Sequence, residues 1–276
     1  MDLKATEETK VVVDARDVPK KVVVITGANG GIGRATAKLL AEVPGVKLVL
    51  VDQTEKVLQL GLFVNQLNVN AKFTAGHIYY VNDVADTQDV HDVAEAIISF
   101  CGRIDVLVHL AGIPPQKFGA FVRTPMEQVQ AVINVNLLGT LNWCHAVLPH
   151  MRSQKFGRVI NTSSVAGHRG DPGNSAYAVS KAGVESITKT LALEAPHNKD
   201  GEPLDITVNA VAPGGTDTPM IKTLPIGFFE EVKARVPFKR WGEPEEIANV
   251  IRYLALDAPQ YLNGVVLSVD GGWSAS

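Results

Sequence analysis

The sequence predicts an α/β protein with a doubly wound, seven-stranded parallel sheet and helices on both faces, in three layers. Seven short aliphatic runs recur along the chain, and most are continuous rather than alternating, which is typical of strands buried on both faces. Segments with helical periodicity lie between these runs, so strands and helices alternate as in repeated βαβ units. Right-handed crossovers would then distribute the helices over both faces of the sheet.

Each element follows from this alternation. The predicted strands are residues 21–26, 47–51, 77–81, 104–110, 158–163, 205–212 and 264–269. The predicted helices are residues 31–43, 54–69, 86–101, 125–153, 174–195 and 243–256. The polar, turn-rich segment 197–203 (HNKDGEP) is predicted to be a surface loop.

The length of 276 residues is compatible with one or two domains. No Ser/Gly linker or charge block divides the chain, which favours a single domain over residues 21–276. Residues 1–20 carry five acidic and four basic side chains before the first strong structural signal, and are interpreted as an N-terminal arm.

Composition excludes several classes of protein. A net charge of −3 gives no field that would attract nucleic acid or acidic lipid. The charged N-terminus and the lack of 18 consecutive apolar residues predict neither a secretory peptide nor a membrane span. The two cysteines, Cys101 and Cys144, lie 43 residues apart and favour a reducing, cytoplasmic location. No metal is expected, because His145 and His150 are five apart on one helical segment.

A glycine-rich turn, TGANGGIG at residues 26–33, directly follows the first strand and precedes a helical segment. Glycines there allow the chain to approach a pyrophosphate, whose charge the helix N-terminus stabilises. The spacing of Gly27, Gly31 and Gly33 is GxxxGxG rather than GxGxxG, and Arg34 excludes a P-loop, which needs GK[ST]. The pattern favours a nucleotide site, and the alternative is a tight turn without a ligand.

Asp52 ends the second predicted strand, 19 residues after Gly33. A carboxylate at this place accepts hydrogen bonds from the adenosine ribose and repels a 2′-phosphate. The glycine-rich turn holds no Lys or Arg, and Gln53 is neutral, so the sequence predicts NAD rather than NADP. The alternative is that Asp52 is an ordinary turn residue.

Tyr177 and Lys181 lie four residues apart near the start of a predicted helix, so they share a face. A nearby ammonium group is expected to lower the pKa of the tyrosine and allow proton transfer near neutral pH. Ser164 follows a predicted strand, 13 residues before Tyr177. Without these neighbours, the Tyr/Lys pair would also fit a solvated helix.

Taken together, TGxxxGxG, the Ser with YxxxK, VNLLG and APGGTDTP resemble the short-chain dehydrogenase/reductase family over roughly residues 20–272. The resemblance implies a Rossmann-like fold. It also implies that Tyr177 donates or accepts the proton and that Ser164 hydrogen-bonds the substrate oxygen. Lys181 would bind the nicotinamide ribose, and Asn136 of VNLLG would hold a water of a proton relay.

The resemblance further implies where the cofactor binds, with Asp83 and Val84 beside the adenine and residues 213–218 around the nicotinamide carboxamide. The predicted cofactor-binding residues are Gly27, Asn29, Gly31, Ile32, Gly33, Asp52, Gln53, Asp83, Val84, Ala111, Gly112, Tyr177, Lys181, Pro213, Gly214, Thr216 and Thr218.

Two features need an explanation beyond the pattern. His109 and Leu110 stand where the family usually has two asparagines, so His109 is expected to brace neighbouring strands or, alternatively, to titrate. Asn134, Asn136 and Gly139 are poor helix-interior residues within a predicted helix, which predicts a contact that offsets their cost, the alternative being a buried Asn bonded to a backbone carbonyl.

We expect the substrate pocket to be walled by residues 112–118, 165–174 and those after Thr218. Met220, Ile226, Phe228 and Phe229 form an apolar set there, typical of a mobile lid. Arg169 is expected to lie in a solvated loop or, alternatively, to meet a substrate carboxylate.

The sequence therefore predicts an NAD-dependent oxidoreductase that interconverts a small-molecule secondary alcohol and a ketone. The alternatives are an epimerase or enone reductase of the same family, and a catalytically idle NAD-binding interaction protein. The resemblance also implies a homodimer or homotetramer.

Overall fold

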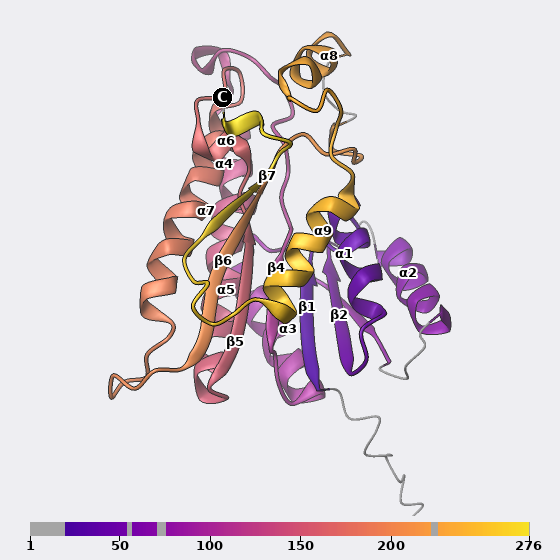
Figure 1. Cartoon of the computed structure of the whole chain (residues 1–276), viewed down its shortest axis with the longest axis vertical. Helices are drawn as coiled ribbons and strands as arrows, with labels where there is room; N and C mark the ends of the chain where they lie inside the picture. Colours follow the sequence, from indigo (N-terminus) through magenta and orange to yellow (C-terminus); the bar gives the residue numbers. More distant parts are fainter. Residues whose placement is uncertain (1–19, 54–56, 71–75, 222–225, 276) are drawn as a thin grey trace, which may run out of the picture.

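A computed structural model of the chain describes residues 20–53, 57–70, 76–221 and 226–275. Its seven strands form one sheet in the order β3-β2-β1-β4-β5-β6-β7, and every neighbouring pair is parallel (Figure 1). The doubly wound sheet is therefore confirmed. The strands are β1 (Lys21–Thr26), β2 (Val46–Asp52), β3 (Ile78–Val81), β4 (Val106–His109), β5 (Phe156–Thr162), β6 (Asp205–Pro213) and β7 (Val266–Val269).

The predicted helices are also present over the residues that the structure describes. They are α1 (Gly31–Ala41), α2 (Val57–Asn70), α3 (Thr87–Cys101), α4 (Met126–Ile133), α5 (Gly139–Ser153), α7 (Ser175–Glu194) and α9 (Pro244–Arg252). A single π-helical turn, Asn134–Leu138, connects α4 to α5. A second one, Tyr253–Asp257, extends α9. The sequence did not predict the short α6 (Val165–His168), α8 (Ile226–Arg235) or the 3₁₀ turns Phe121–Arg123 and Trp273–Ala275.

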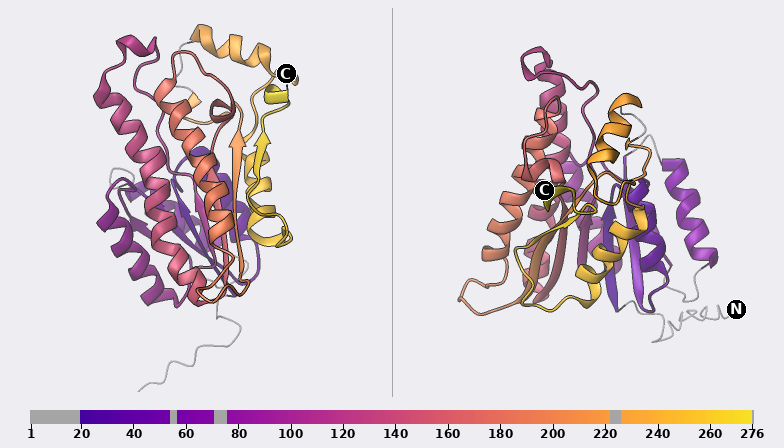
Figure 2. Two further views of the ribbon diagram at one scale, coloured as in Figure 1. Left: turned by 90° about the vertical axis from the view of Figure 1, so that its left-hand side faces the viewer. Right: turned by 45° about the horizontal axis from the view of Figure 1, so that its top comes forward.

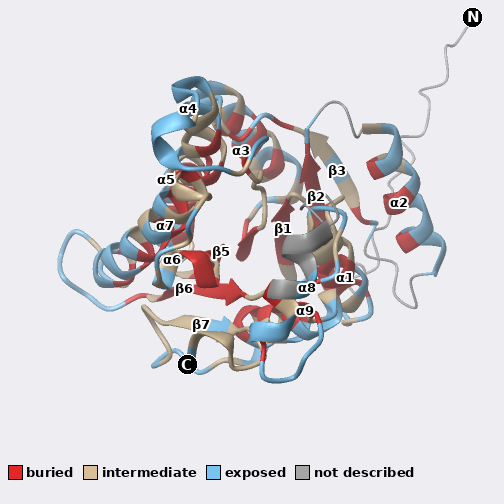
Figure 3. Cartoon of the chain, turned by 90° about the horizontal axis from the view of Figure 1, so that it is seen from above, coloured by how far each residue is buried: buried red, intermediate tan, exposed pale blue. Residues whose placement is uncertain are grey.

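Alternate side chains of β1 enter two separate cores, which is why its sequence is continuously apolar. Val22 and Val24 pack with residues of α3 and α5, whereas Val23 and Ile25 pack with residues of α1, α2 and α9. All four side chains are fully buried. Figure 3 shows the resulting layers from above, with the buried central strands between helices whose outer faces are exposed. The predicted three-layer arrangement is confirmed.

The strand order reverses direction between β1 and β4, because the chain first builds outward to β2 and β3 and then returns to the other side. Thr26 and His109 are paired in register at the ends of these two strands. Helix dipoles and loops meet at such a reversal, which is where open α/β sheets bind ligands. The right-hand view of Figure 2 brings this end of the sheet forward.

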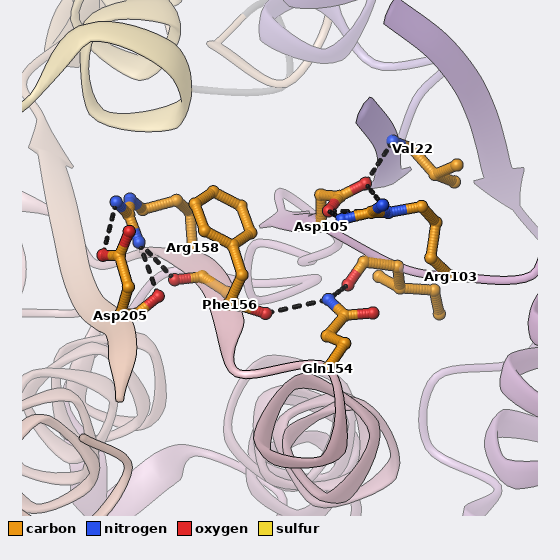
Figure 4. A network of polar contacts seen from close by, with 9 residues as sticks. Val22, Arg103, Asp105, Gln154, Phe156, Arg158 and Asp205 are labelled. Atoms are coloured by element: carbon orange, nitrogen blue, oxygen red, sulfur yellow. Dashed lines mark hydrogen bonds and ion pairs between the residues drawn. The ribbon is translucent and has the colours of Figure 1, made fainter. Parts of the chain in front are cut away.

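A network of charged side chains holds the opposite, amino-terminal end of the strands (Figure 4). The buried Asp105 accepts a hydrogen bond from the backbone N of Val22 at 2.7 Å and pairs with Arg103. Arg158 on β5 pairs with Asp205 on β6 at 2.7 Å. These contacts join β1 to the residue that precedes β4, and β5 to β6, far from the site described below.

One helical stretch, Met126–Ser153, is long and apolar enough to cross a membrane by length and composition. Half of its most apolar window is buried inside the fold, where α5 packs on α3 and α4 packs on α7. Burial within the helical layer accounts for this composition.

The segment 197–203 is a mainly exposed connection before β6, as predicted. Residues 1–19 of the predicted arm lie outside the described residues.

Candidate active site

A cavity of about 620 Å³ lies over the carboxyl ends of the central strands. This volume is in the range of pockets that hold a nucleotide-sized ligand. It extends from Asp52 at the end of β2 to Tyr177 on α7. Every residue that the sequence selected as catalytic or cofactor-binding lines it, with the exception of Asn136.

The glycine-rich turn has the geometry that close approach to a ligand requires. Gly27 has a φ of 61°, and a Cβ there would lie 2.7 Å from the backbone N of Ala111. The first turn of α1 carries no acidic residue, and its N-cap Gly30 provides no side-chain acceptor. The backbone N–H groups and the positive end of the helix dipole are thus available to a pyrophosphate. The turn fits the phosphates of a dinucleotide.

Asp52 has a structural role beside its predicted one. Its carboxylate accepts hydrogen bonds from the backbone N of Asn29 at 2.8 Å and of Gln53 at 2.9 Å. The side chain is 7% exposed and lines the cavity. Asp52 therefore holds the glycine-rich turn in place and also presents negative charge where an adenosine ribose would lie.

Arg34 is a nearby cation that the sequence prediction did not consider as a site residue. Its Nε donates to Asn29 Oδ1 at 2.8 Å, and its guanidinium lies 4.6 Å from the ring centroid of Phe63. The long side chain bends back toward the turn that precedes it. Its position one residue after the GxxxGxG pattern was the available signal.

Ser164 and Tyr177 bring two hydroxyl groups together in the cavity wall. Ser164 caps the short helix α6, where its Oγ accepts from the backbone N of Ala166 at 3.2 Å. Tyr177 lies in the first turn of α7, with Ser164 close enough to act on the pKa of its hydroxyl group. The 13-residue separation thus places both groups at one point.

The prediction that the pKa of Tyr177 is lowered is wrong when only the groups of the protein itself surround it. Burial raises its pKa to about 12, although the hydrogen bond to Ser164 acts in the opposite direction. Lys181 is itself buried, and burial lowers its pKa to about 8. Its Nζ donates to the backbone carbonyl of Thr162 at 2.7 Å and lies 5.6 Å from the Tyr177 ring centroid. Desolvation therefore decides the pKa of Tyr177, and Lys181 does not offset it.

Asn136 lies behind the cavity rather than in its wall, and its side chain is fully buried. Its amide bonds both backbone groups of Ile113, accepting from N at 2.8 Å and donating to O at 3.0 Å. It also donates to Ser180 Oγ on α7 at 3.2 Å. These bonds offset the cost of Asn within a helix, and the bond to the Ile113 carbonyl is the alternative that the sequence left open, a buried Asn bonded to a backbone carbonyl. They also position the loop after β4 against α7. The water-binding role stays a prediction.

His109 joins β4 to β1 through a hydrogen bond between its Nδ1 and Thr26 Oγ1, 2.9 Å apart. Burial, with a smaller contribution from Lys181, lowers the pKa of His109 to about 3. The bracing role is confirmed by this geometry. The alternative, that His109 titrates near neutral pH, is wrong because the ring is completely desolvated.

The remaining part of the cavity, beside Tyr177, is mainly apolar. The loop after β4 contributes Ile113, Pro114, Pro115 and Phe118, and the segment after β6 contributes Met220 and Ile221. The side chains of Ile226, Phe228 and Phe229 from the predicted lid lie outside the described residues.

Trp241 and Trp273 also line this part, although the sequence prediction missed them. Arg169 lies in the loop after α6, as predicted, where it is half-buried and its guanidinium stacks on Trp273 at 4.5 Å. It is not among the described residues that line the cavity. Trp241 lies just before the last predicted helix and Trp273 just after the last predicted strand, where no pattern in the sequence marks a site residue.

Comparisons with known proteins agree with this geometry. A family model described as enoyl-(acyl carrier protein) reductase matches residues 27–274. The 3-oxoacyl-(acyl-carrier-protein) reductase FabG of Thermotoga maritima is 42% identical over 253 residues, which cover 91% of this chain and 97% of that protein. The chain belongs to the short-chain dehydrogenase/reductase family.

Two solved structures of this family have the same fold. Levodione reductase superposes with a TM-score of 0.82 at 36% identity, covering 93% of this chain and 98% of that one. ElxO with NADP bound superposes with a TM-score of 0.80 at 30% identity, covering 93% and 100%. As a member of this family, the protein is an oxidoreductase that binds a nicotinamide cofactor and acts on carbonyl or hydroxyl groups of small molecules.

Proposed function

We propose that this short-chain dehydrogenase/reductase is an NAD(H)-linked enzyme that interconverts a secondary alcohol and a ketone. The observation that carries the proposal is the meeting of the Ser164 and Tyr177 hydroxyl groups with Lys181 in the wall of one cavity. With a carbonyl oxygen bound beside them, each hydroxyl group would donate one hydrogen bond to it, since such an oxygen accepts two.

Each residue of the site would have one role in the proposed reaction. The bound nicotinamide would supply or accept the hydride at the reacting carbon. Tyr177 would transfer its hydroxyl proton to the carbonyl oxygen in reduction and take it back in oxidation, while Ser164 holds that oxygen. Its raised pKa keeps Tyr177 protonated at neutral pH, as ketone reduction requires. Lys181, which lines the cavity, would bind the ribose.

NAD is proposed rather than NADP because Asp52 presents its carboxylate at the adenosine end. A 2′-phosphate would meet this negative charge at short range. The related ElxO binds NADP, and Arg34 is a cation close to the glycine-rich turn, so cofactor preference requires its own measurement.

The names of the relatives support a ketone as substrate, since levodione reductase and 3-oxoacyl-(acyl-carrier-protein) reductase both reduce oxo groups. Enoyl reduction is the second candidate, because it is the reaction named in the family model. The Ser164–Tyr177 pair favours the carbonyl reaction.

Turnover by a Tyr177→Phe variant tests the proposal. NADH oxidation would be followed by absorbance with cyclohexanone, acetoacetyl-CoA and the enone crotonyl-CoA. We expect the wild type to reduce at least one of the ketones, and the variant to lose about 10²- to 10⁴-fold in kcat, because it lacks the transferable proton. NADH binding, measured by nicotinamide fluorescence, should be retained.

Each alternative has a distinct result. Reduction of crotonyl-CoA alone would favour the enone reductase, and NADH binding without turnover would favour the idle binding protein. Ketone turnover by Tyr177→Phe at the wild-type rate would exclude the proposed proton donor.

We also propose a homodimer or homotetramer, supported by apolar residues on the outer face of the helical layer. Leu138 is 41% exposed and Val179 on α7 is 62% exposed. Light scattering on a Val179→Glu variant tests this, since a charge within an interface would dissociate the subunits.

A further inference from the structure

A chain of hydrogen bonds behind the cavity connects α7 to the short helix that Ser164 caps. Glu185 on α7 is buried, with 8% of its surface exposed. Its Oε1 accepts a hydrogen bond from Ser163 Oγ at 2.7 Å and lies 2.9 Å from Nδ1 of His168. Neither Glu185 nor His168 is among the described residues that line the cavity, so the proposed reaction gives them no direct role.

The chemistry of the carboxylate determines the direction of these bonds. An ionised carboxylate only accepts hydrogen bonds, so His168 carries a proton on Nδ1 and Ser163 directs its hydroxyl proton at Glu185. The second ring nitrogen of His168, Nε2, lies 3.1 Å from Ser268 Oγ on β7. One buried acceptor thus holds the residue after β5 and the last residue of α6 against α7, and His168 extends the chain to β7.

The backbone of α6 packs directly against these groups. A Cβ at Gly167 would lie 2.7 Å from Glu185 Oε1 and 2.8 Å from Ser163 Oγ, closer than real Cβ atoms approach. The backbone N of Gly167 also donates to the carbonyl O of Ser164 at 2.8 Å. A helix of four residues is too short to be stable by itself, so the position of α6 depends on the groups that it packs against.

Both ends of α6 are joined to the substrate part of the cavity. Ser164, at its N-cap, holds the substrate oxygen in the proposed reaction. Arg169, which follows its last residue, stacks on the cavity-lining Trp273 at 4.5 Å. A shift of α6 would displace both groups. The glycine-rich turn at residues 26–33 lies between β1 and α1, at the other end of the cavity.

We propose that Glu185 and His168 form a positioning pair, which holds α6 so that Ser164 Oγ meets the substrate oxygen. The pair acts through α6 and not by contact with the substrate or the cofactor. This inference rests on the proposed function, because it assigns the position of Ser164 to that reaction. It predicts a defect with the ketone and none at the adenosine end of the cofactor.

Two substitutions of Glu185 separate its hydrogen bonds from its charge. The amide oxygen of Glu185→Gln can accept from both Ser163 and His168, so kcat/KM for the ketone should stay within about threefold of the wild type. Glu185→Ala removes both bonds. With cyclohexanone or acetoacetyl-CoA it should lose at least about tenfold, because misplacing the reacting groups by about 1 Å can cost about a hundredfold. Kd for NADH, from nicotinamide fluorescence, should change by less than about twofold in both variants.

His168→Leu tests whether the two residues act as one unit. It removes the bonds to Glu185 and Ser268 and should lower kcat/KM for the ketone by at least about threefold. The double variant Glu185→Ala/His168→Leu should be no slower than Glu185→Ala alone, because substitutions within one network are not additive. If Glu185→Ala does not fold, Ser163→Ala, which removes the other bond of Glu185, should match the loss in His168→Leu. Glu194→Ala, an exposed change on the same helix, is the matched control and should behave like the wild type.

A lower melting temperature of Glu185→Ala with wild-type kcat/KM for the ketone would overturn this inference and leave a purely structural role. An equal loss of NADH affinity would do the same, because the defect would then be general. Failure of the proposed function would appear separately, as ketone turnover that Tyr177→Phe does not change.

If the wild type reduces neither ketone, hydrogen exchange measured by mass spectrometry tests the positioning directly. Glu185→Ala should then take up deuterium faster than the wild type in residues 163–169 but not in residues 26–33, and Glu185→Gln should match the wild type in both. Equal uptake by Glu185→Ala and the wild type in residues 163–169 would overturn the inference.

Discussion

Thr26 donates its hydroxyl proton to Nδ1 of His109 across the reversal point of the sheet, with 2.9 Å between the two atoms. The direction follows from the other partners of Thr26 Oγ1, which accepts from the backbone N atoms of Leu110 and Ala111, each at 3.2 Å. With both acceptor positions engaged, the hydroxyl proton is directed at the ring. The neutral ring of His109 therefore carries its own proton on Nε2.

This arrangement predicts that His109 makes the fold sensitive to acid. The pKa of His109 is lowered from 6.5 to about 3, so between these values the unfolded chain binds a proton that the folded chain does not. The free energy of unfolding is therefore not reduced by His109 above pH 6.5, and it decreases as the pH falls from 6.5 toward 3. At pH 5 the loss from this residue is about 2 kcal/mol.

Urea unfolding at pH 8 and pH 5 measures the effect. In His109→Asn, which can still bond Thr26, the loss of stability between the two pH values should be about 2 kcal/mol smaller than in the wild type. His197→Asn, a change in the exposed loop before β6, is the control and should behave like the wild type. An identical pH dependence in wild type and His109→Asn would show that His109 is charged in the folded state.

A second prediction concerns cofactor preference. Asp52→Asn removes the charge but keeps one acceptor oxygen for the backbone N of Asn29 or Gln53. We expect kcat/KM with NADP to rise at least tenfold relative to NAD, because the repulsion of the 2′-phosphate is lost. Steady-state kinetics with both cofactors give this ratio.

Asp52→Ala separates the charge from the structural role of this residue. It removes both backbone hydrogen bonds, so its melting temperature should fall below that of Asp52→Asn. Arg34→Ala in the Asp52→Asn background should reverse part of the gain with NADP, if Arg34 supplies the nearest cation. An NAD/NADP ratio that none of these changes alters would contradict the assignment of NAD.

The extent to which the sequence predicts this site differs from residue to residue. The strands were predictable because a strand that is buried on both faces has a continuous apolar sequence, as in residues 21–26. The positions of Ser164 and Tyr177 follow from the strand and helix that carry them. The pKa of Tyr177 was not predictable, because it depends on desolvation by neighbours from distant segments and on where Lys181 points.

The same limit applies to Asn136 and Trp273. Asn136 lies in a π-helical turn, Asn134–Leu138, and its side chain bonds Ile113 rather than lining the cavity. A prediction from periodicity assumes a regular α-helix and does not include such a turn. Trp273 reaches the cavity only because β7 returns the C-terminal residues to the edge of the site. Contacts between distant segments have no local signal in the chain.

A third prediction follows from Lys181, whose pKa burial lowers to about 8. Ketone reduction needs a protonated Tyr177, which its raised pKa ensures, and a charged Lys181 to bind the cofactor. We therefore expect kcat/KM for reduction to be level below about pH 8 and to fall above it. Lys181→Arg should be slower but should lack this alkaline limb, because guanidinium stays charged. If kcat/KM of that variant still decreased above about pH 8, the decrease would be due to another group.

The last prediction concerns stability at the end of the sheet remote from the site. Asp105 is fully buried and accepts from the backbone N of Val22, so Asp105→Ala leaves a buried donor without its partner. The free energy of unfolding should decrease by about 1–3 kcal/mol in urea. Because the cavity lies at the other end of the strands, kcat and KM of the folded variant should equal those of the wild type. Arg103→Ala is the matched comparison and should cost less, because the Arg103 side chain is 43% exposed and its loss leaves the bond from Val22 intact. A change in KM equal in the two variants would instead mean that this network positions the site.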